Sequence, residues 1–194
     1  MNPAIGNTRE QLLEAAVDLL QRVGYASFSF RDLAEVVGIR TASIHYHFPT
    51  KADLGVALID FLREYTRARE REMRDQHPDV CARLLALADR MAEKCADQRS
   101  CPMNILQAEY AVLPPAMQQA LHTLIDEKLQ LIGAWLEEGR AAGQLRFPGS
   151  AIAQAQLVWS VIEYGSQLAR SHPDRSLHAL VRQLVDTMSP AKTP

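Results

Sequence analysis

The stretch FSFRDLAEVVGIRTASIHYHF, residues 28–48, decides how this chain folds. Ser29 stands where a helix N-cap is expected, and Gly38 is the residue type that most readily ends a helix in the left-handed conformation. A second short helix is predicted to start after the turn and to end before Pro49, which cannot continue it. Two short helices joined by a tight glycine turn form the helix-turn-helix pattern, whose second helix enters the major groove of DNA.

The second helix, predicted over 41–48, has a narrow apolar side. Ile44 and Phe48 lie one turn apart and form its buried stripe. The side chains left on the other faces are mostly polar: Thr41, Ala42, Ser43, His45, Tyr46 and His47. Tyr46 is open to a second interpretation, as a packing residue. His45 and His47 are not expected to bind one metal ion together, because side chains two residues apart on a helix point about 200° apart.

The rest of the chain also shows helical spacing and no strand alternation. Thr8 with Gln11 forms a capping box for a first helix that ends at Gly24, and Thr50 with Asp53 starts a longer helix. Residues 33, 36 and 37 are expected to form the inner face of the helix before Gly38. Later breaks are predicted around 76–78, 97–102, 143–149 and 173. The fold class is therefore predicted to be all-α.

The last two predicted helices, 150–172 and 176–188, carry more apolar surface than one small domain covers. Leu177, Val181, Leu184 and Met188 follow a heptad-like stripe. This pattern favours a homodimer closed by a four-helix bundle. The alternative is that these helices complete the core of the monomer.

Composition limits the class of protein without naming a partner. The 194 residues are 47% hydrophobic and 23% charged, which is typical of a soluble globular protein. No run approaches the roughly 20 apolar residues that span a bilayer, and residues 1–7 lack an export pattern, so a cytoplasmic protein with reduced thiols is expected. The net charge of −2, and five basic against five acidic side chains in residues 1–51, do not favour DNA binding. The prediction of DNA binding therefore rests on the order and spacing of residues in the helix-turn-helix and not on net charge.

The segment GYASFSFRDLAEVVGIRTASIHYHFPTKADL, residues 24–54, resembles the N-terminal signature of the TetR family of repressors. The resemblance is specific over about 50 N-terminal residues. The remaining residues resemble the family more loosely, by the number of predicted helices and by the stretch 101–114. It implies a three-helix helix-turn-helix DNA-binding domain over 1–53 and a helical effector-binding and dimerisation domain over 54–194. The partners it implies are double-stranded operator DNA, a small-molecule effector and a second copy of the chain, with no membrane and no cofactor.

The resemblance also assigns roles to single residues. Thr41, Ala42 and Ser43 are expected to face base edges, where hydroxyl groups and a methyl group can contact bases. Contacts to the sugar-phosphate backbone are expected from His45, Tyr46, His47 and Lys51. Further DNA contacts are expected from Ser29, Arg31 and Arg40. Arg40 departs from the small hydroxyl residue usual there, so the helix cap is expected to fall to Thr41.

Effector or redox sensing is the role expected of a second set of residues. Cys101 precedes Pro102, which favours the first position of a helix, so the thiol is expected at an N-cap where the helix dipole stabilises a thiolate, with Arg99 nearby. The surrounding stretch loosely resembles an electrophile-responsive TetR subgroup, although Met103 stands where a second cysteine is often seen. The full expected set is Cys101, Met103, Tyr110, Trp135, Trp159 and Tyr164. The aromatic members have ordinary core packing as the alternative.

The sequence contains none of the catalytic motifs that we considered. The chain lacks a Cys-x-x-Cys pair, a His-Glu-x-x-His motif, a glycine-rich phosphate loop and a Gly-x-Ser-x-Gly elbow. We therefore expect no catalytic residue and no metal. The alternative function is a helical small-molecule-binding protein, or an enzyme that uses Cys101 or His122, without DNA-dependent activity.

Overall fold

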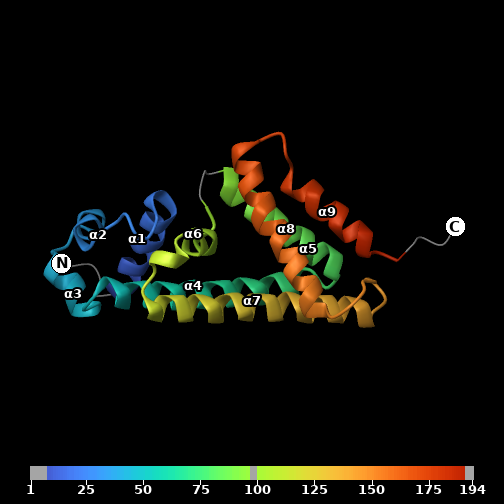
Figure 1. Ribbon diagram of the computed structural model, residues 1–194, viewed down its shortest axis with the longest axis horizontal. Coiled ribbons are helices and arrows are strands. Elements are labelled where there is room, and N and C mark those ends of the chain that lie inside the picture. The colour runs from blue at the N-terminus through green and yellow to red at the C-terminus, as the bar shows by residue number, and fades with distance from the viewer. Residues whose placement is uncertain (1–7, 97–99, 191–194) are drawn as a thin grey trace. The chain divides into compact units, whose positions relative to one another are not determined.

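A computed structural model describes residues 8–96 and 100–190 of the chain (Figure 1). The described residues form helices and no strand, which confirms the all-α prediction. The elements are α1 (Thr8–Val23), α2 (Phe30–Val37), α3 (Thr41–His47), α4 (Lys51–Gln76), α5 (Val80–Ala96), α6 (Pro102–Ala108), the 3₁₀ helix η1 (Tyr110–Val112), α7 (Pro115–Ala141), α8 (Ala151–Ser171) and α9 (Leu177–Met188). The predicted break at 97–102 falls partly on residues 97–99, which lie outside the described residues.

The chain divides into two compact units. The first combines Met1–Tyr65 with Ser100–Leu124, and the second combines Thr66–Arg99 with Ile125–Pro194. Two of the boundaries fall inside long helices, α4 and α7, and the third falls between α5 and α6. This division describes packing, and the functional boundary at residue 53 remains a prediction. Among the described residues, no helix combines the length and the apolar character needed to cross a membrane.

The core of the first unit forms where α1 packs on α2 and α6, and α2 on α3. Leu12 and Leu20 of α1, Leu33 of α2 and Ile44 of α3 are fully buried there. The expected inner face of α2 is wrong at one position. Val36 is exposed and Ala34 is buried in its place, because at about 100° per residue Val36 lies on the opposite side of Leu33 from Ala34.

The second unit is built around α5, α8 and α9, which pack on one another (Figure 1). Its buried side chains include Leu84 of α5, Val158 of α8 and Val181 of α9. Gly165 lets α9 approach α8 closely, because a Cβ atom there would lie 2.7 Å from Leu177 Cδ1. The monomer therefore buries one side of each of the last two helices in its own core.

A buried arginine fixes the bend between α4 and α5. Arg83 donates from Nη1 to Glu138 Oε2 at 3.0 Å and from Nη2 to Glu138 Oε1 at 3.2 Å. Its Nε also donates to the carbonyl of His77 at 3.0 Å, and its guanidinium carbon lies 5.3 Å from the centre of the Trp135 ring. One side chain thus ties the break at 76–78 to α7.

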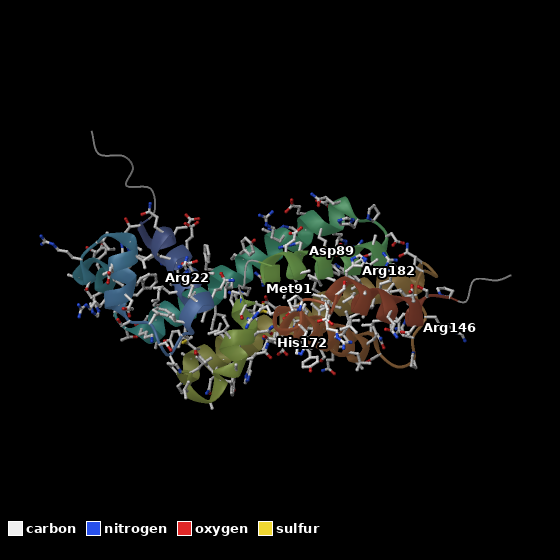
Figure 2. All side chains as sticks on the ribbon, turned by 90° about the horizontal axis from the view of Figure 1, so that it is seen from above. Arg22, Asp89, Met91, Arg146, His172 and Arg182 are labelled. Carbon is white, nitrogen blue, oxygen red and sulfur yellow. The ribbon has the colours of Figure 1, made fainter. Side chains whose placement is uncertain are left out.

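On the surface of the second unit, Asp89 of α5 and Arg182 of α9 lie near each other (Figure 2). His178 connects them. Its Nδ1 donates to Asp89 Oδ1 at 2.5 Å, and its Nε2 accepts from Arg182 Nη2 at 3.3 Å. The two hydrogen bonds select the tautomer of His178 with the proton on Nδ1 and tie α9 to α5.

Candidate functional site

The start of α2 is fixed by a reciprocal capping box. The backbone N–H and the hydroxyl of Ser29 both donate to Asp32 Oδ2, at 2.7 and 2.6 Å, and the N–H of Asp32 donates to Ser29 Oγ at 3.3 Å. These hydrogen bonds from Ser29 lower the pKa of the Asp32 carboxyl. The carboxylate therefore stays ionised at neutral pH and holds the first turn of α2 in place.

The turn between α2 and α3 depends on Gly38. Its φ is +74°, its N–H donates to the carbonyl of Ala34 at 2.9 Å, and the N–H of Ile39 donates to the same carbonyl at 3.1 Å. The expected cap of α3 at Thr41 is wrong. Arg40 occupies the N-cap position without a side-chain cap, and its carbonyl accepts from the N–H of Ser43 at 2.9 Å. The backbone alone starts this helix, and the Arg40 side chain stays exposed.

The face of α3 that points away from the core carries the candidate DNA contacts. Ile44 and Phe48 are buried and anchor the helix, as predicted. The side chains of Ala42, Ser43, His45 and Tyr46 are exposed, and those of Thr41 and His47 are half-buried. Tyr46 is 86% exposed, which is incompatible with the alternative that it packs into the core of its own chain.

His45 is oriented by two contacts near the end of α3. Its Nδ1 lies 3.2 Å from the carbonyl of Pro49 and donates to it, and its ring meets Phe30 edge-on with the ring centres 4.9 Å apart. A neutral His45 therefore has its proton on Nδ1 and presents Nε2 as an acceptor. Arg31 of α2 is also exposed.

Lys51 makes contacts within the first unit. Its Nζ lies 4.6 Å from the centre of the Tyr25 ring and 5.0 Å from that of Phe28, and it donates to the carbonyl of Ala26 at 3.4 Å. Burial lowers the pKa of the Lys51 ammonium, and the charge of Glu109 opposes this effect. Burial also raises the pKa of Tyr25 to about 12, so its hydroxyl stays protonated and donates to the Lys51 carbonyl at 2.8 Å.

Glu109, just after α6, is a residue that sequence reasoning missed. Its Oε2 accepts from the N–H of Ala26 at 3.1 Å, in the turn between α1 and α2. At the other end of α6, Gln21 Nε2 donates to the carbonyl of Ser100 at 3.0 Å. The two ends of the α6 segment are thus bonded to α1 and to the turn between α1 and α2. No local motif marks this contact, because its partners are far apart in sequence.

Cys101 lies at the N-cap position of α6 with Pro102 at the first helical position, as predicted. The cysteine is half-buried and Met103 is buried. Arg99, expected nearby, lies outside the described residues. In the second unit, burial raises the pKa of the Cys81 thiol.

The expected effector aromatics lie in different surroundings. Trp135 and Trp159 are buried in the second unit, whereas Tyr164 is 68% exposed. Tyr110 belongs to the first unit, where its hydroxyl lies 2.8 Å from His122 Nε2 and the two rings stack. Within the second unit, Tyr164 therefore does not share the buried surroundings of the two tryptophans.

Two family models match the chain. The model of bacterial regulatory proteins of the tetR family matches residues 12–58, which include the helix-turn-helix. The model of the tetracyclin repressor-like C-terminal domain matches residues 80–185, which is more than half of the chain. Both units therefore contain residues matched by a model of the same family.

Individual relatives agree with these models. The crystal structure of a TetR-family transcriptional regulator from Agrobacterium tumefaciens is 31% identical, with a TM-score of 0.86, over 93% of this chain and 97% of that chain. The HTH-type transcriptional regulator LmrA of Bacillus subtilis is 25% identical over 70% of this chain and 77% of its own length. The nucleoid occlusion factor SlmA of Marinobacter nauticus is 36% identical over 80 residues, 41% of either chain, so the chain matches less than half of that relative. The chain belongs to the TetR family of bacterial regulatory proteins, which are DNA-binding transcriptional regulators.

Proposed function

We propose that the protein is a homodimeric repressor that binds a palindromic operator through α2 and α3 and leaves it when an effector acts on the rest of the chain. The observation that carries this proposal is the exposed polar face of α3, held outward by the buried side chains of Ile44 and Phe48. One short helix reads only a few bases, so two copies are needed for a specific site.

Each candidate residue has a proposed part in DNA binding. Thr41, Ala42 and Ser43 face the base edges, because they occupy the first turn of the recognition helix. Contacts to phosphate come from a larger set, listed here as Ser29, Arg31, Arg40, His45, Tyr46, His47 and Lys51. For Lys51 to reach a phosphate, its ammonium must leave the rings of Tyr25 and Phe28. Ser29 can contribute only an acceptor while its hydroxyl proton is held by Asp32.

Selection from random double-stranded DNA followed by fluorescence anisotropy tests the DNA proposal. The selected site should be an inverted repeat whose half-site centres lie about 34–36 Å apart. Thr41→Ala with Ser43→Ala should bring the affinities for selected and scrambled sites closer together. Arg40→Ala should weaken binding to both and reduce the salt dependence. Glu93→Gln, an exposed change on α5, serves as the control. Unchanged preference in the double variant would refute the assignment of α3 as the recognition helix.

The dimer proposal rests on apolar side chains that the monomer leaves uncovered on its last two helices. Leu157 is 58% exposed and lies two turns before Tyr164 on α8, while Leu180 is exposed on α9. Buried residues on the other sides of these helices, such as Ile162 and Val181, already complete the monomer core. A second copy of the chain, closing a four-helix bundle across a two-fold axis, would cover the exposed side.

Release of DNA is proposed to follow from movement of α6. This helix carries Cys101 at its start, and the residues flanking it, Ser100 and Glu109, bond to α1 and to the turn after it. A modified thiol or a bound molecule that displaces α6 would therefore shift the segment that presents α3. A coupling free energy of about 1–3 kcal/mol would lower operator affinity roughly 5- to 150-fold.

The thiol version of this proposal is tested with Cys101→Ser. Wild-type protein treated with N-ethylmaleimide should lose operator affinity, and the serine variant should keep it. Cys81→Ser is the matched control and should respond like wild type, because the raised pKa of Cys81 disfavours its thiolate. If Cys101→Ser still releases DNA on treatment, the thiol is not the switch and a reversibly bound effector is the remaining route.

A further inference from the structure

Glu163 on α8 has a buried carboxyl group that no described residue hydrogen-bonds. Neither of its oxygens is exposed to solvent, and neither has a hydrogen-bond partner within the described part of the chain. Burial raises its pKa to about 7, and the charge of Lys128 opposes this effect. An ionised carboxylate in such a place is unfavourable unless a donor reaches it.

Lys128 of α7 is the nearby cation, and it is already engaged elsewhere. Its Nζ donates to Glu70 Oε1 at 2.7 Å, with the two side chains only 5% and 11% exposed. The same ammonium lies 5.1 Å from the centre of the Trp159 ring. Trp159 is one helical turn before Glu163, so both side chains lie on the same side of α8. We refer to Glu70, Lys128, Trp159 and Glu163 as the Glu163 cluster.

The charges on the adjoining parts of α4 and α7 do not supply the missing cation. Glu127, next to Lys128, accepts from Arg67 Nη2 on Oε1 at 2.7 Å, and its Oε2 is buried without a partner. Arg67 thus bonds to Glu127 and Lys128 to Glu70, and neither cation donates a hydrogen bond to Glu163. Either a proton on Glu163 or a bound cation would neutralise its charge.

We propose that the Glu163 cluster is a recognition site for an organic ammonium ion with an apolar body, and that such a compound is the effector class. The ammonium would donate to the two oxygens of Glu163, and the apolar body would lie against the indole of Trp159, which also favours a nearby cation. Binding would convert a neutral Glu163 into a paired carboxylate and release its proton to solvent. An anionic ligand would meet carboxylates instead of donors and is disfavoured. The effector assignment rests on the proposed regulatory function, whereas the binding site does not.

Isothermal titration calorimetry of the full chain tests this site with phenethylammonium chloride as the probe. The neutral 2-phenylethanol carries the same phenyl ring and should bind at least about tenfold more weakly, because it cannot form the charge-assisted hydrogen bond between an ammonium ion and the Glu163 carboxylate. Titrations at pH 6 in two buffers of different ionisation enthalpy should show release of about 0.9 proton per site, and at pH 8 release of about 0.1. Glu163→Gln, which has nearly the same shape without the charge, should remove both the preference and the proton release. Glu93→Gln should change neither.

The outcomes separate this proposal from the regulatory one. No saturable binding of phenethylammonium by wild type at millimolar concentration, equal affinity for the alcohol, or no proton release at pH 6 would each overturn the site, and none of these readouts needs a variant. Operator affinity is measured on the same protein without probe. If phenethylammonium binds but no operator binding is found, the ammonium site is supported and the proposed regulatory function is refuted. Ammonium binding that leaves operator affinity unchanged would confirm the site and refute its role as the effector site.

Discussion

The buried carboxyl of Glu163 makes the stability of the protein depend on pH in a specific direction. Its pKa is about 7 in the folded chain against an ordinary value of 4.5. The folded state therefore holds the proton more tightly than the unfolded state, and the free energy of unfolding falls as pH rises from about 4.5 to about 7. Each pKa unit corresponds to about 1.4 kcal/mol, so the loss attributable to this one group is about 3 kcal/mol. The loss is complete at about pH 8, one unit above the pKa of the folded state, and is constant beyond it.

Glu163→Gln removes this titration and leaves a neutral side chain of nearly the same shape. Urea unfolding of wild type and variant, measured at intervals from pH 4.5 to pH 8 without ligand, gives the difference in unfolding free energy at each pH. That difference should change by about 3 kcal/mol across the range, because the unfolding free energy of wild type falls as pH rises and that of the variant lacks this decrease. Glu93→Gln, at an exposed position on α5, should track wild type. A difference for Glu163→Gln that stays flat with pH would refute both the burial of the carboxyl and its lack of a hydrogen-bond donor.

Three further predictions concern other parts of the fold. Gly38→Ala should cost about 1–2 kcal/mol in urea unfolding, because alanine at φ +74° is strained although no atom lies in the way of its Cβ; an unchanged midpoint would contradict the turn geometry. Leu157→Glu should sediment as a monomer with a normal helical circular dichroism spectrum, because the leucine is exposed in the monomer; a variant that remains dimeric would place the interface elsewhere. Arg83→Met should lower the unfolding free energy by about 1.5–3 kcal/mol through loss of its hydrogen bonds to Glu138; a smaller loss than that of an exposed Arg22→Met control would remove Arg83 as the residue that fixes the bend.

The parts of the fold that sequence predicted correctly depend on neighbours three or four residues away. The N-cap at Ser29, the helix start at Thr50 with Asp53, the glycine turn at Gly38 and the buried pair Ile44 and Phe48 all have this local origin. Helix periodicity and caps are properties of a single turn, so one sequence suffices to identify them. The same local order of residues carried the family resemblance that the comparisons confirmed. The prediction that Thr41 caps α3 was wrong. Arg40 occupies the N-cap through its backbone alone, and a backbone cap leaves no signal in the side-chain sequence.

The features that only tertiary structure decided involve helices distant in sequence. Glu109 reaches the turn after α1, Lys51 folds onto aromatic rings, and Glu163 is enclosed beside a lysine that already has a partner. In the sequence, Glu163 is one charged residue among the apolar positions of α8 and carries no mark of burial. Whether a carboxyl group costs or contributes free energy depends on the water and the donors around it, and packing between helices sets both. Sequence alone determined which helices form and what α3 exposes, and tertiary packing decided which charged groups lack a partner.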